Sequence, residues 1–95
     1  MPRIPRDELL SVPGVGPSIA RDLHDLGVHT VADLRTIDPE RLYETLCRRR
    51  GARIDPCVLY EFRCAAYFAD RRRHDPALLQ WWNWKGRRYR PRRSG

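Results

Sequence analysis

The stretch Val12-Pro13-Gly14-Val15-Gly16-Pro17-Ser18-Ile19-Ala20 decides the fold of this chain. Pro13 cannot continue a helix and Gly14 tolerates positive φ, so a short helix that begins near Asp7 must end here. Pro17 then favours the start of a second helix, whose apolar residues recur with helical spacing. So short a turn leaves several backbone amides unpaired at the positive end of the second helix. That arrangement suits an anion, and a phosphate above all.

Outward from this turn, the sequence predicts helices and no strand. The expected helices cover residues 7–12, 17–26, 30–35, 39–49, 56–69 and 77–82. Gly27 is expected to end the second helix and Gly51 the fourth. The helix at 56–69 is apolar almost all round, which is typical of a central helix. We therefore expect an all-α fold, a compact bundle of five to six helices.

The start signals of these helices are unusually regular. Thr30 and Asp33 have the spacing of a capping box. Three Asp-Pro pairs each place an N-cap residue before a proline at the first helical position. These pairs are Asp38-Pro39, Asp55-Pro56 and Asp75-Pro76.

Charge divides the chain unevenly. Residues 1–75 hold 13 Arg against 12 acidic residues, whereas residues 76–95 hold Lys85, five Arg and no acid. We expect an irregular segment at 1–6, one small domain at 7–85 and a basic, disordered tail at 86–95. Such a tail attracts polyanions. Arg87 and Arg88 of the tail, with Lys85 at the end of the domain, are the expected contacts.

A second basic segment joins the fourth and fifth helices. Its arginines, Arg48, Arg49, Arg50 and Arg53, could reach a phosphate backbone, or form an exposed loop without function. This segment joins two helices as the first turn does, so we expect the domain to consist of two similar halves. The second half is degenerate, because its turn lacks the Gly-x-Gly of the first.

Three cysteines, Cys47, Cys57 and Cys64, show no CxxC pair. Buried thiols are the simplest interpretation. A zinc site formed by these cysteines and His74 fits no familiar spacing, so it is the minor alternative.

Residues 9–27 resemble the helix-hairpin-helix motif, which reads apolar-x-Gly-apolar-Gly before a helix with Ala and Leu at core positions. The match extends through Ala20, Leu23 and Leu26-Gly27. The resemblance implies a hairpin that grips a DNA backbone without reading bases. It assigns the phosphate-facing amides to Gly14, Gly16, Ser18 and Ile19, with Pro13, Val15 and Arg21 beside them. It also implies a monovalent cation held by the carbonyls of Leu10, Val12 and Val15.

Beyond the motif, the chain resembles the pathogenicity-locus family of small bacterial helix-hairpin-helix proteins, some of which are called mitomycin resistance proteins. The segment at 57–65, Asp75-Pro76 and the ending Trp81-Trp82-Asn83-Trp84-Lys85 carry the resemblance. The overall organisation is similar to SAM-like helical domains. The resemblance implies a DNA-related role without a mechanism.

Three function classes follow. The first is a sequence-independent DNA-binding module in DNA repair, stress response or uptake. One feature counts against it, because Asp22 and Asp25 lie on the helix after the hairpin, where carboxylates would repel the DNA phosphates. The second is a protein-interaction domain in which the hairpin only packs. The third, an enzyme, has little support, since only a Schiff base at Lys85 suggests itself. Of the tryptophans, two are expected to close the bundle, and an exposed one could instead stack on an unpaired base.

Neither a secretory leader nor a membrane span is expected, so we expect a cytoplasmic monomer.

Overall fold

Residues 7–89, which the computed structural model describes, form four α-helices and three 3₁₀ helices, with no strand in that range. The α-helices are α1 (Pro17–Asp25), α2 (Val31–Leu34), α3 (Pro39–Arg50) and α4 (Pro56–Asp70). The 3₁₀ helices are η1 (Glu8–Ser11), η2 (Pro76–Leu79) and η3 (Trp81–Trp84). The all-α prediction is confirmed. Within these residues no helix has the length and apolar character that crossing a membrane requires.

The first and last expected helices are not α-helices. The helix expected at 7–12 is the 3₁₀ helix η1, and the one expected at 77–82 is divided into η2 and η3 by the extended residue Gln80. Side chains take the carbonyls that a continuous helix would use. Asn83 Nδ2 donates to the carbonyl of Ala77 at 2.7 Å, and Trp84 Nε1 donates to the carbonyl of Leu78 at 2.8 Å.

The predicted start signals are confirmed. Thr30 and Asp33 form a reciprocal capping box at α2, because the Thr30 side chain accepts from the Asp33 amide and the Asp33 side chain from the Thr30 amide. Each aspartate of the three Asp-Pro pairs accepts from the amide two residues on, at 2.9 to 3.0 Å. These bonds satisfy amides that a helix start otherwise leaves unpaired.

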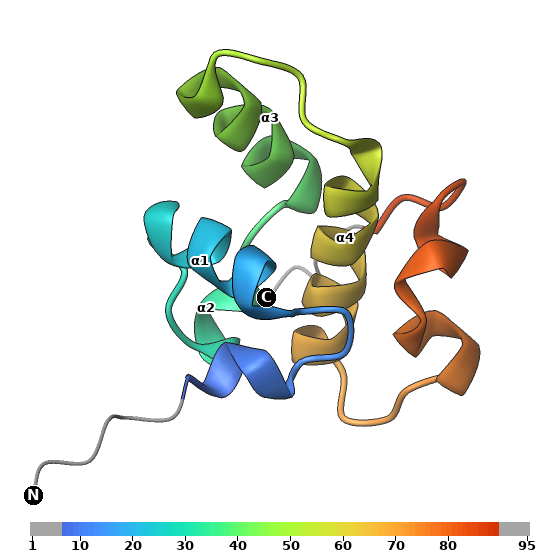
Figure 1. Ribbon diagram of the computed structural model, residues 1–95. Coiled ribbons are helices and arrows are strands. Elements are labelled where there is room, and N and C mark those ends of the chain that lie inside the picture. The colour runs from blue at the N-terminus through green and yellow to red at the C-terminus, as the bar shows by residue number, and fades with distance from the viewer. Residues whose placement is uncertain (1–6, 90–95) are drawn as a thin grey trace, which may run out of the picture.

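The centre of the molecule is α4, as its apolar sequence predicts. It packs against α2 and α3 on one side and against η2 and η3 on the other (Figure 1). Phe62, Ala65 and Ala69 join a core cluster that includes Leu9 of η1 and the buried apolar residues of α1. Cys64, Ala66 and Tyr67 of the same helix join a second cluster.

The second cluster includes part of the expected tail. Tyr89 is only 6% exposed and lies with its ring 5.9 Å from that of Trp84 and 6.5 Å from that of Tyr67. Residues 86–89 therefore lie against the domain. The remaining part of the expected tail, and the irregular segment expected at 1–6, lie outside the described residues.

Candidate nucleic-acid interface

The turn at residues 12–16 joins η1 to α1 in the conformation that its glycines favour. Gly14 has a φ of 84°, in the left-handed region that few other residues adopt. The Val15 amide donates to the Val12 carbonyl at 3.0 Å, which closes the turn. Val12 and Val15 are buried, whereas Gly16 is exposed. The apolar side chains thus hold the turn to the core while its last residue meets solvent.

The N-terminus of α1 differs from those of the other α-helices. Its N-cap is Gly16, which has no side chain to accept a hydrogen bond. In the described part of the chain, no protein group accepts a hydrogen bond from the amides of Ser18 or Ile19. The Ser18 residue is exposed, whereas the Ile19 side chain is buried. These amides carry the partial positive charge of the helix end and can donate to an anion.

The other face of the turn is covered. A Cβ at Gly14 would lie 3.3 Å from Cβ of Trp81, so Gly14 packs against η3. The Cys64 thiol also lies 3.7 Å from the Pro13 carbonyl. A Cβ at Gly16, by contrast, would meet no atom within 4 Å. Gly16 and Ser18, rather than Pro13 and Gly14, are therefore the residues of the turn region that a large partner can approach.

The carbonyls expected to hold a cation were Leu10, Val12 and Val15. The Val12 carbonyl already accepts from the Val15 amide. A carbonyl oxygen has two lone pairs, so Val12 keeps one for an ion. No hydrogen bond within the described residues uses the other two carbonyls. Carbonyl oxygens are a type of ligand that a monovalent cation takes, and the cation site at these three residues stays a prediction.

The two acids of α1 are paired. Asp22 is 8% exposed and its Oδ1 lies 2.5 Å from Arg50 Nη2, which is also 3.8 Å from Asp25 Oδ2. Arg49 donates to the Asp25 carbonyl. Asp22 therefore turns toward α3 and is neutralised there, which weakens the objection that it would repel DNA. Arg49 and Arg50 hold α3 to α1 and are the less available of the expected basic contacts.

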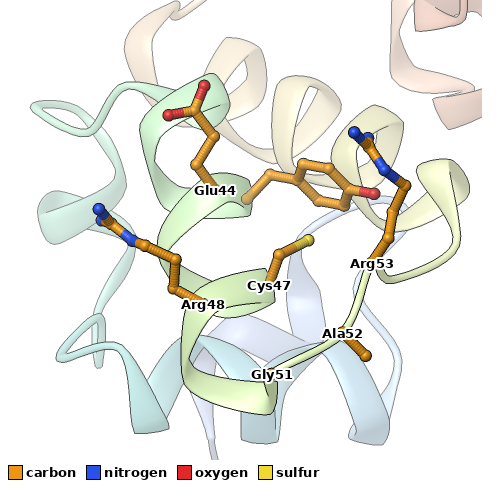
Figure 2. A pocket seen from close by; sticks show the side chains of 7 residues that line it. Glu44, Cys47, Arg48, Gly51, Ala52 and Arg53 are labelled. Atoms are coloured by element: carbon orange, nitrogen blue, oxygen red, sulfur yellow. The ribbon is translucent and has the colours of Figure 1, made fainter.

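The remaining basic residues lie in several places. Arg21 and Lys85 are exposed. The Arg87 guanidinium lies 6.0 Å from the centre of the Trp84 ring, and Arg88 Nε lies 3.7 Å from Glu40 Oε1. Arg48 and Arg53 line a separate cavity formed by α3 and the loop that follows it (Figure 2). The structure thus does not gather the arginines into one patch.

The three tryptophans have three different environments. Trp84 is buried at 2% exposure and Trp81 is partly buried beside Gly14. Trp82 is 55% exposed, and its ring lies edge-on to that of Trp81 at 5.7 Å. Two tryptophans thus close the bundle and one faces solvent.

Two ionisable clusters were not found from the sequence. Arg63, buried on the apolar helix α4, donates from Nε and Nη2 to both Glu40 carboxylate oxygens at 2.7 and 3.0 Å, and from Nη1 to the Trp84 carbonyl at 2.7 Å. These bonds lower the pKa of Glu40 despite its partial burial. Their partners are more than 20 residues apart, so no local pattern reveals them.

The second cluster is a chain of three side chains. His24 Nε2 donates to Asp7 Oδ2 at 2.8 Å, and His24 Nδ1 lies 2.7 Å from His29 Nδ1, with the two rings stacked. A proton must lie between the two Nδ1 atoms. The hydrogen bond from His24 lowers the pKa of Asp7. Sequence spacing missed this pair because Gly27 turns the chain back after α1.

The cysteines lie in separate environments. Cys47 lines the cavity of Figure 2, Cys57 lies in the first turn of α4 beside Asp55, and Cys64 is fully buried. In the described range no group of three or more His, Cys, Asp and Glu side chains has the arrangement of a metal site.

Comparison of the sequence with known proteins identifies a matching family and a similar protein. The sequence profile described as "Pathogenicity locus" matches residues 5–90. The chain is 35% identical over 83 residues to the protein named "Mitomycin resistance protein McrB" of Streptomyces lavendulae, an alignment that covers 87% of this chain and 75% of that protein. No solved structure matches.

Proposed function

This chain belongs to the pathogenicity-locus family, and we propose that it is a sequence-independent DNA-binding module. In this proposal the turn at 12–16 and α1 form a helix-hairpin-helix unit, and the α3–α4 pair forms a second, degenerate half. The module binds one phosphate backbone as a cytoplasmic monomer and catalyses no reaction. Its setting is DNA repair, stress response or uptake, and the resistance named for the relative fits a stress response.

One observation carries the proposal, namely the open N-terminus of α1. Where α2, α3 and α4 use side chains to satisfy their first amides, α1 begins with a glycine and leaves Ser18 and Ile19 without an acceptor. A phosphate oxygen placed there would receive two hydrogen bonds and the field of the helix dipole. Because backbone amides are the same whatever the bases, such a contact is independent of DNA sequence.

Charge near the site supports the same reading. Arg21 is exposed on α1, and the ion pair with Arg50 neutralises the negative charge of Asp22 on the same helix. Lys85 follows η3, which packs on the turn through Trp81. Counterion release then supplies most of the affinity, which must fall steeply with salt.

The experiment substitutes Gly16→Asp and measures binding to a labelled duplex by fluorescence anisotropy at low salt. The new carboxylate would accept from the amides of α1, which raises helix stability by a few tenths of a kcal/mol while it occupies the phosphate position. We expect affinity to fall about tenfold or more. Gly16→Ala, which adds neither charge nor cap, should bind like the parent protein.

A second control separates the site from net charge. Ala32→Asp makes the same change of charge at an exposed position of α2 and should lower affinity far less. If Gly16→Asp binds DNA as tightly as Ala32→Asp, the turn does not hold the phosphate.

A second candidate is a protein-interaction domain. It is favoured by the intramolecular pairing of Arg49 and Arg50 and by the exposure of Leu10 (47%) and Trp82 (55%). In this case the turn only packs two helices together, and neither the parent protein nor Gly16→Asp would bind DNA.

A further inference from the structure

The cavity formed by α3 and the loop that follows it lies outside the turn that carries the proposed DNA site. It exists because α3 ends at Gly51 in the left-handed conformation and the chain then runs through residues 52–55 before α4 begins. Its volume is about 470 Å³, which is within the usual size range of small-ligand sites. The Tyr43 ring and Ala52 supply apolar lining, and Cys47, Arg48 and Arg53 supply the polar groups (Figure 2).

The Cys47 thiol is fixed at the wall of this cavity. Its sulfur accepts a hydrogen bond from the Ile54 amide at 3.5 Å and points toward the side where Arg53 lies (Figure 2). The Tyr43 hydroxyl donates to the Ile54 carbonyl, so the tyrosine is held as well. Burial raises the pKa of Tyr43, and its contact with Cys47 raises it further, so the phenol stays neutral. The sulfur is the nucleophile that remains.

The charge around Cys47 is positive. Neither Arg48 nor Arg53 forms an ion pair with an acid among the residues described. Arg53 lies on the side that the sulfur faces, whereas Arg48 extends from the opposite side of α3 (Figure 2). Glu44 also lines the cavity, with its carboxylate directed away from the sulfur (Figure 2). Arg53 is therefore the cation on the side of the cavity that the sulfur faces.

The other two thiols provide a contrast within the same molecule. Cys57 lies beside Asp55 and Glu61, whose carboxylates, with burial, raise the pKa of its thiol. Cys64 is fully buried, which raises the pKa of its thiol to about 11. Cys57 is partly exposed as well and has Lys85 near it, but the carboxylates of Asp55 and Glu61 outweigh that positive charge. Cys47 instead shares its cavity with two arginines, the cationic environment in which reactive cysteines are found.

We propose that this cavity is a capture site for small carboxylate-bearing electrophiles, with Cys47 as the nucleophile and Arg53 as the group that holds the carboxylate. The thiol proton leaves to solvent, the sulfur attacks the electrophilic carbon, and a carbon–sulfur bond forms as the bond to the leaving group breaks. The leaving group departs with the electron pair, so no oxidant or reductant is needed. This inference is independent of DNA binding.

The test compares iodoacetate with iodoacetamide, which differ in charge but have the same leaving group. Each cysteine lies on its own tryptic peptide, at residues 42–48, 54–63 and 64–71, so mass spectrometry gives three rates from one full-length sample. We expect the iodoacetate-to-iodoacetamide rate ratio at Cys47 to exceed that at Cys57 about tenfold. Equal ratios at these two cysteines would overturn the proposal.

Variants identify the charge responsible. Arg53→Gln should lower the ratio at Cys47 about threefold, Arg48→Gln less, and Arg53→Lys should retain it. Arg72→Gln, at an exposed position just beyond the C-terminal end of α4, serves as the control and should leave the ratio at Cys47 unchanged. An Arg53→Gln ratio equal to that of the parent protein would contradict the assigned role of Arg53.

A measurement without a charged reagent tests binding itself. Benzoate, an unreactive carboxylate, should slow iodoacetamide at Cys47 and leave the rate at Cys57 unchanged. If benzoate slows neither cysteine, the cavity does not hold carboxylates, and the proposal fails even where the charge effect is present.

Discussion

The bond between Glu40 and Arg63 should be one of the main determinants of stability. Arg63 is 8% exposed and lies on the central helix, and its guanidinium donates twice to Glu40 and once to the Trp84 carbonyl. It therefore links α3, α4 and η3. Glu40→Gln keeps the size of the side chain but leaves the buried guanidinium without its counter-charge.

The expected loss of stability in Glu40→Gln follows from the burial of the ion pair. Removal of one partner of a buried ion pair costs about 3 to 5 kcal/mol. The Glu40 side chain is 18% exposed and Arg88 is also near it, so water reaches the pair and the loss should be about 3 kcal/mol. The first turn of α3 contributes a little more, because a carboxylate there interacts favourably with the helix dipole.

Urea denaturation at neutral pH measures this loss, with Glu44→Gln as the control. Glu44 is exposed on the same helix, and its substitution should change the free energy of unfolding by no more than about 0.5 kcal/mol. A loss of that small size for Glu40→Gln would refute the importance given to the pair.

The pH dependence supplies a second check. The hydrogen bond from Arg63 lowers the pKa of Glu40 in the folded state below its ordinary value. The contribution is therefore complete above about pH 4.5 and is lost as pH falls through the folded pKa. The difference between Glu40→Gln and the parent protein should be greatest near neutral pH and shrink in acid.

Three further outcomes are expected. Burial raises the pKa of Glu61 above its ordinary value, so its charged form destabilises the fold at neutral pH but not in acid. Glu61→Gln should therefore stabilise the protein at pH 7 by less than about 1 kcal/mol. Thermal melts of variant and parent protein at pH 7 and pH 4 test this, and a variant that is no more stable than the parent at pH 7 counts against it. Gly14→Ala should destabilise the protein by about 1 to 3 kcal/mol, because Gly14 has a φ of 84° and a Cβ there approaches Trp81. Gly86→Ala, where a Cβ meets open space, is the control. Equal unfolding midpoints for the two variants would show that the turn is not constrained. Trp82→Ala should weaken binding of single-stranded DNA about tenfold and of duplex much less, as anisotropy can measure; equal losses on both would mean that Trp82 does not stack on unpaired bases.

Much of the fold follows from local chemistry. The Asp-Pro pairs, the Thr30 capping box and the left-handed glycines each need only neighbouring residues, and the structure confirms them. The apolar surface of α4 likewise indicates its central position. Such features can be inferred from sequence because the interacting groups are within four residues of each other.

The features that sequence did not reveal depend on distant partners. The division of the last helix arises from Asn83 and Trp84, whose side chains bond carbonyls six residues earlier. The pairing of Asp22 with Arg50 and the contact of His24 with His29 depend on how elements pack and how a turn folds back. A sequence shows that Asp22 is acidic, but only the fold shows where it points.

The central claim is that the open amides of α1 bind a phosphate. The most direct measurement is a titration of the ¹⁵N-labelled full-length chain with a short duplex, followed by amide chemical shifts at low and high salt. We predict that the Ser18 and Ile19 amides shift most at low salt and return as salt is added. Unchanged Ser18 and Ile19 resonances, with shifts only elsewhere or none, would contradict the account.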